Sequence, residues 1–250
     1  MKTGIAVIGG VGFRPDGRPC DVETPFGRVS ALRTSIGDSD VLFIPRHGEC
    51  HLPPHKIDYR ALVCAARTEG ASRVISINTV GTMSYHEMGC LFIPVDFVEF
   101  TWGRKNTFFE ERAVHVEMTK PYCPEIANHL RSAIRSQAIE PHEGVYVCAQ
   151  GPHLESPAQI RMMRPFGDVV GMTGYPEVVL ARELGLCYAS LCLVTNPACG
   201  MSDQAFQAED VLGGMGRFQE TIWQVLAETL ASLPLTRSCS CFAALDRARF

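Results

Sequence analysis

The segment that most constrains the fold is residues 169–200, VVGMTGYPEVVLARELGLCYASLCLVTNPACG. Its first apolar residues, 169–170, stop at a Gly-Met-Thr-Gly turn, and Pro176 suits the first turn of a helix, where its missing N–H needs no partner. Gly185 suits the left-handed end of that helix. Residues 187–195 are then nearly all apolar, which is typical of a strand buried on both faces. The segment therefore predicts a strand, a helix and a second strand.

Short apolar runs that end abruptly in glycine or polar residues recur along the chain, at residues 5–8, 41–44, 74–77 and 146–149. The carboxyl ends of parallel strands meet at one edge of a sheet, where α/β proteins bind ligands. We therefore expect residues 172–173 and 195–196, which follow the two strands of the first segment, to lie side by side at that edge. A cleft lined from many strands follows from the same pattern.

Helices are expected between these strands, at residues 59–69, 123–137, 156–164 and 208–233. Residues 97–112 are aromatic and polar with poor periodicity, which predicts a long loop; loops of that length are usually either functional or flexible. The sequence contains no repeat and no interdomain linker. It therefore predicts one α/β domain over residues 1–234, followed by a poorly packed tail at 235–250.

The charge and hydropathy of the chain exclude two classes of partner. The formal net charge is −4, which gives no reason to expect binding to nucleic acid or to an anionic membrane. No apolar run approaches the roughly 20 residues of a membrane span. A cytoplasmic location is the default expectation.

Two strand ends contain groups suited to an anion. The glycines of residues 9–12 could present backbone N–H groups, but Pro15 stands where the dinucleotide fingerprint requires its third glycine, so a tight turn is an equal alternative. Arg46 suits bidentate phosphate contacts and, with residues 78–79, could form a phosphate pocket. The alternative is a surface arginine beside a hydrogen-bonded core histidine, His47.

Three histidines raise the question of a metal site. His47, His51 and His55 would align on a helix, but Gly48 and the Pro-Pro pair at residues 53–54 oppose a helix there, and no carboxylate completes a familiar site. We therefore expect no metal.

Most of the eleven cysteines lie in apolar runs as small hydrophobic residues. The Cys-Ser-Cys at 239–241 is either a pair of tail thiols or a disulfide.

Two polar residues at strand ends could recognise an organic ligand. Glu155 could accept hydrogen bonds from a donor-rich ligand edge, or it could cap the next helix. Asn196 carries a donor and an acceptor and could match a cyclic ligand that shows C=O beside a ring nitrogen. The alternative for Asn196 is a simple Asn-Pro turn.

A family resemblance extends along nearly the whole chain. Its motifs, in order, are IGGVGF, TPFG, PRHGECHLPPHKIDYRA, NTVG, HVEMTKPYC, QGPHLES and VVGMTGYPEVVLARELGLCYASL. In these the chain resembles the trimeric purine nucleoside phosphorylase and methylthioadenosine phosphorylase family. The resemblance implies a central mixed, largely parallel sheet flanked by helices. It also implies phosphorolysis, in which phosphate attacks C1′ of a ribose while the purine leaves, with inorganic phosphate as co-substrate and no other cofactor.

The resemblance also implies roles for individual residues. Catalysis would rest on Arg46, His47 and Asn196, and phosphate would be bound by Val11, Arg46, His47, Asn78, Thr79 and Thr173. The family usually has a hydroxyl residue in place of Val11, so only the main-chain N–H could serve there. The implied nucleoside-binding residues are Met172 (under the ribose), His115, Leu154, Glu155, Asn196, Pro197, Ala198, Ala208 and Val211. His115 would reach a neighbouring subunit's sugar site, which implies a homotrimer or a hexamer.

The purine base can be inferred from the same resemblance. Members that act on 6-aminopurines carry an aspartate in the Thr-Asn-Pro-Ala segment, whereas this chain has Asn196 and Ala198 there. Glu155 agrees with a 6-oxopurine, because a carboxylate can accept from N1–H of hypoxanthine or guanine.

The 5′ substituent is inferred from a residue that is missing. Members that bind a 5′-hydroxyl have a histidine downstream of the base-binding asparagine, but this chain has no histidine after His153. Phe206, Ala208 and Val211 could line an apolar pocket instead, which favours a methylthio group. The implied substrate is S-methyl-5′-thioinosine. An inosine or guanosine phosphorylase, a methylthioadenosine phosphorylase, a nucleosidase and a non-catalytic binding module are the alternatives.

The Cys-Ser-Cys at 239–241 resembles a motif of hyperthermophilic archaeal members, where it accompanies disulfides. If this carries over, Cys123 and Cys199 would form a further pair.

Overall fold

The computed structural model describes residues 4–84, 86–203, 208–246 and 248, with backbone alone at 208–212, 214–215 and 217. Within this part, one sheet has the strand order β2-β3-β4-β1-β5-β8-β7-β6-β9, with a further pairing of β5 to β9. Its strands are β1 (Ile5–Gly9), β2 (Arg18–Thr24), β3 (Gly27–Ile36), β4 (Ser39–Pro45), β5 (Arg73–Thr82), β6 (Leu91–Phe100), β7 (His142–Ala149), β8 (Val169–Gly171) and β9 (Cys187–Pro197). Parallel and antiparallel pairings both occur, so the predicted mixed sheet is confirmed.

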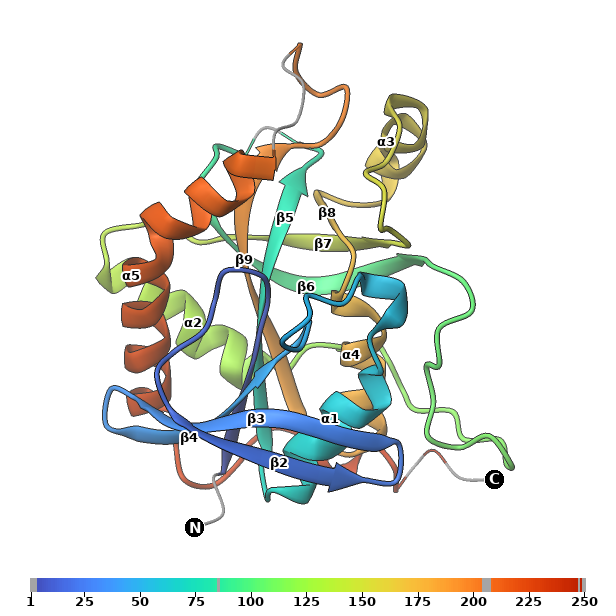
Figure 1. Cartoon of the computed structure of the whole chain (residues 1–250), viewed down its shortest axis with the longest axis vertical. Helices are drawn as coiled ribbons and strands as arrows, with labels where there is room; N and C mark the ends of the chain where they lie inside the picture. Colours follow the sequence, from blue (N-terminus) through green and yellow to red (C-terminus); the bar gives the residue numbers. More distant parts are fainter. Residues whose placement is uncertain (1–3, 85, 204–207, 247, 249–250) are drawn as a thin grey trace.

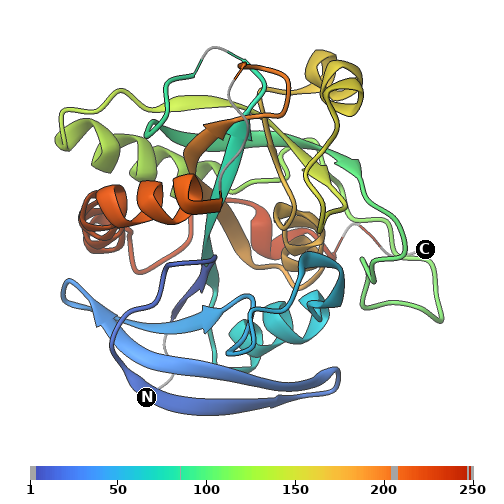
Figure 2. The same ribbon diagram turned by 45° about the horizontal axis from the view of Figure 1, so that its top comes forward.

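The sheet closes on itself in one half. Strand β5 pairs with both β8 and β9, and the path from β9 through β6 and β7 returns to β8. In Figure 1, β5 and β9 run upright through the centre of the molecule, and β6 and β7 cross them. The β2–β3–β4 ribbon lies at the other end, near the N-terminus, as the turned view in Figure 2 also shows.

Helices cover both faces of the sheet. Helices α2 (Pro124–Ser136) and α5 (Ala208–Ser232) pack on one face, whereas α1 (Tyr59–Thr68) and α4 (Gly174–Glu183) pack on the other. Alternate side chains of one strand therefore enter different cores: Val7 contacts the α2–α5 side, and Ala6 and Ile8 contact the α1–α4 side. Both faces of the central strands are buried, in agreement with their nearly continuous apolar sequences.

Local signals place the helix ends close to the predicted ones. Asp58 caps α1 by accepting from the Ala61 N–H, and Ser156 forms a capping box with Gln159 at the start of α3 (Pro157–Met163). The four helices predicted between strands are confirmed, with ends that differ by no more than about one residue. Short 3₁₀ turns complete the helical structure at Pro54–Lys56, Arg164–Phe166 and Cys241–Ala243.

Two predictions about these elements are wrong, and one strand pair was missed. The loop expected at 97–112 begins later, because β6 continues through Phe100 and pairs with β7. The antiparallel β2–β3 pair was not predicted, since β2 is mostly exposed and polar and the buried apolar residues of β3 are interrupted by polar ones. The chain after Pro234 is not poorly packed: Cys239, Cys241, Ala244 and Ala248 are all buried.

The two strand ends of the 169–200 segment meet in a different way from the predicted one. Strand β8 runs antiparallel to β5, and β9 runs parallel to it, so β8 and β9 share no parallel edge. Gly81 of β5 instead pairs with Val170 on one side and with Asn196 on the other. The end of β8 and the end of β9 therefore lie on opposite sides of β5 and are joined through it. None of the described helices combines the length and apolarity needed to cross a membrane.

Candidate active site

A cavity of about 380 Å³ opens where the ends of β1, β4, β5, β8 and β9 converge. Ten residues predicted to bind substrate line it: Val11, Arg46, His47, Thr79, Leu154, Glu155, Met172, Thr173, Asn196 and Ala198. Asn78, Pro197 and His115 do not line it. Phe206 and the side chains of Ala208 and Val211 lie outside the described residues.

Arg46 is buried at one end of the cavity and is held by the protein itself. Its Nε donates to Glu177 Oε1 at 2.5 Å, and its Nη2 donates to Glu177 Oε2 at 3.2 Å and to Ser76 Oγ at 2.5 Å. Its Nη1 donates to the Ile77 carbonyl at 3.0 Å. A guanidinium has five N–H groups, so one Nη1–H is left for a ligand beside Gly10.

Glu177 was not predicted from the sequence. It lies in the first turn of α4, is fully buried, and also accepts hydrogen bonds from Ser76 Oγ and Tyr188 Oη. Burial by itself would lower the pKa of the Arg46 guanidinium, but the Glu177 carboxylate more than offsets this and raises that pKa above its ordinary value. Arg46 is therefore a fixed cation whose position is set by Glu177.

His47 presents one ring nitrogen to the cavity. Its Nδ1 lies 2.8 Å from the Leu52 carbonyl, and because a carbonyl can only accept, Nδ1 carries the proton. Burial lowers the pKa of His47. The Leu52 hydrogen bond partly opposes this shift, and the nearby Arg46 charge adds to it. At neutral pH the ring is therefore neutral, with the Nε2 lone pair available to accept a proton from a ligand hydroxyl.

Thr173 is positioned by Asn78, which lies behind it. The Thr173 hydroxyl donates to Asn78 Oδ1 at 3.0 Å, and Asn78 Nδ2 donates to Ser190 Oγ at 2.5 Å. The Asn78 side chain is thus occupied within the protein and lies outside the cavity wall. Tyr146 Oη accepts from the Thr173 N–H, which fixes the backbone of the same residue.

Asn196 faces the other part of the cavity with half of its amide unused. Its Oδ1 accepts from the Thr195 hydroxyl at 2.9 Å, and its Nδ2 donates to the Pro197 carbonyl at 2.9 Å. A carboxamide has two N–H groups and two lone pairs on oxygen. One of each remains for a ligand that offers both a donor and an acceptor.

Glu155 is a buried carboxylate in the cavity wall, with 7% of its surface exposed. Burial raises the pKa of this carboxyl above its usual value, and a contact with its own backbone N–H and the His153 charge only partly oppose that shift. A buried carboxylate of this kind is stabilised when a ligand N–H replaces the hydrogen bonds to water that it lost on burial.

Met172 lies on the cavity wall in a position fixed from two sides. Gly151 has φ of +62°, and a Cβ there would lie 2.5 Å from Met172 Sδ. Arg104, from the segment after β6, donates from Nη1 to the carbonyls of Met172 and Tyr175, each at 2.7 Å, and from Nη2 to the Gln150 carbonyl at 2.8 Å. Arg104 was missed in the sequence, although its segment was expected to be a functional or flexible loop.

The remaining predicted residues lie elsewhere. His115 is exposed, and its N–H donates to the Ala248 carbonyl. The expected Cys123–Cys199 pair is wrong, because Cys199 lines the cavity whereas Cys123 contacts Cys187, Cys239 and Cys241. Within the described residues, the histidines at 47, 51 and 55 form no group that could hold a metal ion.

The geometry thus places a fixed cation, a neutral histidine, a carboxamide and a buried carboxylate in one cavity. Residues 4–231 match the family model of the phosphorylase superfamily. The chain belongs to this superfamily. The predicted fold class and enzyme class are thereby confirmed.

Two curated relatives span nearly the whole chain. A probable S-methyl-5′-thioinosine phosphorylase of Methanosarcina acetivorans is 48% identical over 95% of this chain and 93% of its own. A 6-oxopurine nucleoside phosphorylase of Pyrococcus furiosus is 39% identical over 98% of each chain. Among solved structures, a methylthioadenosine phosphorylase from Schistosoma mansoni in complex with tubercidin has a TM-score of 0.90 and 26% identity, covering 99% of both chains.

Proposed function

We propose that this phosphorylase cleaves S-methyl-5′-thioinosine with inorganic phosphate to give hypoxanthine and 5-methylthioribose 1-phosphate. The observation that carries the proposal is that Asn196 and Glu155 share one cavity with Arg46, His47 and Thr173. A nucleophile site and a base-reading site therefore flank the space that a ribose would occupy.

Phosphate would be held by the last Nη1–H of Arg46, the Thr79 hydroxyl and the Val11 N–H. The Thr173 hydroxyl donates its proton to Asn78 and would face the phosphate as an acceptor. Hydrogen phosphate carries one hydroxyl, and the neutral Nε2 of His47 can accept a hydrogen bond from it. A phosphate oxygen then attacks C1′ as the C1′–N9 bond breaks and its electron pair passes to the purine. The purine anion takes up a proton from solvent to give hypoxanthine. Because phosphate is the nucleophile, the protein contributes positioning and charge stabilisation.

The base end supports a 6-oxopurine. An ionised Glu155 accepts from N1–H of hypoxanthine, whereas N1 of adenine is itself an acceptor and would be repelled. Asn196 can donate its unused N–H to N7 or O6 as negative charge develops on the leaving purine. The relatives from Methanosarcina acetivorans and Pyrococcus furiosus both carry names for 6-oxopurine chemistry, which supports this choice.

The methylthio group is inferred from the absence of any histidine after His153. Without that partner, a buried 5′-hydroxyl would lose its hydrogen bonds to water, at a cost of about 1–3 kcal/mol. The name of the Methanosarcina acetivorans relative agrees with a methylthio substrate. The Pyrococcus furiosus relative favours the main alternative, phosphorolysis of inosine or guanosine.

The proposal is tested by product analysis with S-methyl-5′-thioinosine in the presence and absence of phosphate. We expect hypoxanthine and 5-methylthioribose 1-phosphate, formed only when phosphate is present. Release of free 5-methylthioribose without phosphate would show a nucleosidase and would contradict the proposal.

We further propose a homotrimer, or a hexamer built from two trimers, in which His115 completes a neighbouring subunit's sugar site. Its exposed position outside its own cavity supports this role. Sedimentation equilibrium gives the assembly state, and a monomer that is fully active would contradict it.

A further inference from the structure

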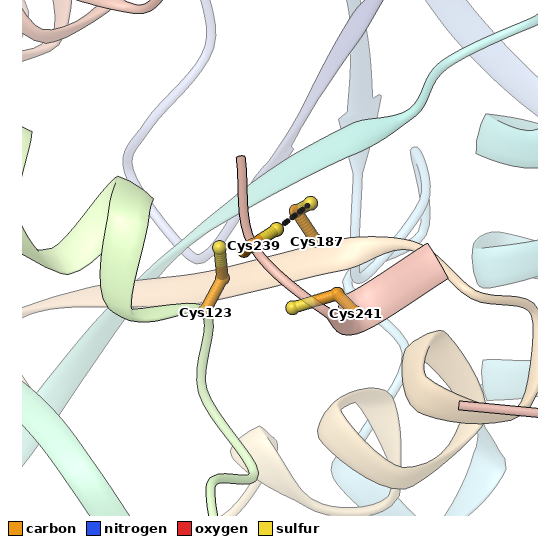
Figure 3. A group of neighbouring side chains, drawn as sticks. All are labelled: Cys123, Cys187, Cys239 and Cys241. Carbon is orange, nitrogen blue, oxygen red and sulfur yellow. Dashed lines mark hydrogen bonds between the residues drawn. The ribbon is translucent and has the colours of Figure 1, made fainter. Parts of the chain in front are cut away.

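Four cysteines that lie far apart in the sequence meet at the end of the sheet opposite the active site. Cys123 precedes α2, Cys187 begins β9, and Cys239 and Cys241 come from the chain after α5. Figure 3 shows the four side chains directed toward one another. All four sulfur atoms lie within 4.8 Å of one another, and all four residues are buried.

We propose that these four cysteines form a structural zinc site, with Zn²⁺ bound by four thiolates. A tetrahedral zinc ion with Zn–S bonds of about 2.3 Å holds its sulfur atoms about 3.8 Å apart. The sulfur atoms already lie close to that spacing, so side-chain adjustments suffice to bring all four to one ion. Four soft thiolate donors favour Zn²⁺ over harder divalent ions, and a closed four-sulfur shell is typical of structural sites.

The surroundings offset part of the charge of such a site. Four thiolates and one Zn²⁺ carry a net charge of −2. Arg237 Nη1 lies 4.0 Å from Cys187 Sγ and is held there by the Gly185 carbonyl at 2.9 Å. Cys123 occupies the N-cap of the thirteen-residue helix α2, where the helix dipole favours a negative group.

A second set of contacts holds the C-terminal ligands in place. Glu125, in the first turn of α2, accepts from the backbone N–H of Ser238 at 2.7 Å, immediately before Cys239. Arg73 pairs with the same carboxylate at 3.0 Å and also donates to the Pro234 carbonyl at 2.8 Å. These bonds bring the chain from 234 to 241 against α2 and β9 before any ion binds, so the ligands are preorganised.

A disulfide would require different chemistry. No disulfide bond joins the cysteines in this structure, and the sulfur atoms of Cys187 and Cys239 are 3.2 Å apart. Formation of each disulfide removes two electrons and two protons and therefore needs an oxidant. Zinc binding needs only the release of thiol protons, which Zn²⁺ promotes.

The ion would stabilise the protein without entering the reaction. Cys187 and Asn196 lie at opposite ends of β9, nine residues and about 30 Å apart at about 3.3 Å per residue. A four-sulfur shell leaves no open position for substrate. The zinc would therefore fasten the C-terminal segment to α2 and β9, and its loss should lower the thermal midpoint while the reaction centre stays intact.

The first test measures metal in protein purified without a histidine tag and without added metal. Elemental mass spectrometry of the digested protein should detect zinc. The Cys241→Ser variant should have lost most of it. The matched control is Cys90→Ser, because Cys90 belongs to a second possible metal group, with His86 and His142. Zinc that persists in Cys241→Ser, or that is lost only in Cys90→Ser, would contradict the proposal, as would iron in place of zinc.

A second test uses the unmodified chain and so does not depend on the folding of a variant. Replacement by Co²⁺ should give the intense sulfur-to-cobalt charge transfer and visible bands of tetrahedral thiolate coordination. Thiol titration of protein unfolded in chelator without reductant should detect all eleven cysteines. Absence of the cobalt bands, or a thiol count lowered by four through disulfides, would contradict the zinc site.

Discussion

The two ends of the active-site cavity are built differently. At the phosphate end, Arg46 has almost all of its donors bound by Glu177, Ser76 and the Ile77 carbonyl. At the base end, Asn196 and Glu155 retain hydrogen-bonding capacity within the cavity wall. If the proposed function is correct, the phosphate end is preorganised for any nucleoside, whereas the base end determines which nucleoside is used.

The largest expected effect comes from Glu177→Gln, which removes the charge that compensates Arg46. Breaking a buried ion pair costs about 3–5 kcal/mol, so the free energy of unfolding should fall strongly. Phosphorolysis of every nucleoside should fall by the same factor, because the loss is at the phosphate end. Urea unfolding and the KM for phosphate with two nucleosides measure both effects.

Glu183→Gln is the matched control for that variant. Glu183 is also buried on α4, but it accepts from the Thr107 hydroxyl and the Phe108 N–H and does not contact Arg46. We expect a smaller loss of stability and a nearly unchanged KM for phosphate. An equal rise of this KM in both variants would show that Glu177 has no particular role in holding Arg46.

The next largest effect is expected from Asn196→Asp, which gives the base end a group that can donate to N7 when protonated. A hydrogen bond to a charged group is worth about 1.5–3 kcal/mol, so the preference should shift toward 6-aminopurines by about tenfold to a hundredfold. The ratio of kcat/KM for methylthioadenosine and methylthioinosine measures the shift.

Asn78→Asp supplies the comparison at the phosphate end. Asn78 contacts Thr173 and not the cavity, so this variant should lower activity with both nucleosides and leave their ratio unchanged. A ratio that responds to Asn78 and not to Asn196 would reverse the assignment of the two ends.

A smaller effect is expected from Gly151→Ala. A left-handed backbone costs a residue with a Cβ about 1–2 kcal/mol, and here the added carbon also meets Met172 Sδ. The control is Gly103→Ala, with φ of +69° and no atom within 4 Å of the added carbon. Both variants should lose stability, but only Gly151→Ala should raise the KM for the nucleoside. Identical nucleoside KM values would show that Met172 does not contact the sugar.

The smallest effect near neutral pH concerns Glu155. Burial raises the pKa of its carboxyl, so it becomes protonated, and loses the ability to accept from N1–H, at a pH above the usual value of about 4.3. As the pH falls through this raised pKa, kcat/KM for methylthioinosine should decline. In Glu155→Gln this part of the pH profile should disappear. If kcat/KM of the variant declines over the same pH range and to the same extent, the decline belongs to another group, such as His47.

The sequence was sufficient to predict the elements whose signals are local. The strands of the central sheet are continuous apolar runs, and the helices have caps and prolines at their starts. By contrast, the end of β6 is recognisable only through its pairing with β7, for example of Phe100 with Ala149. In the β2–β3 pair, β2 is mostly exposed and polar and polar residues interrupt the buried apolar residues of β3, so the pair gives little apolar signal.

The residues missed in the site depend on distant partners. Glu177 has the appearance of an ordinary first-turn acid of a helix, and its ion pair with Arg46 joins positions 131 residues apart. Arg104 acts through backbone carbonyls, which no side-chain motif reveals. The cysteine group has the same origin, since its four members come from three regions of the chain that only the fold brings together.

The central claim is tested most directly by internal competition. Equal concentrations of S-methyl-5′-thioinosine, inosine and methylthioadenosine are mixed with phosphate and a trace of enzyme, and the loss of each is followed by chromatography. The ratio of initial rates then gives the ratio of kcat/KM values. The account predicts that S-methyl-5′-thioinosine is consumed first. Faster consumption of inosine would contradict the proposed 5′-methylthio specificity, and faster consumption of methylthioadenosine would contradict the reading of the base by Asn196 and Glu155.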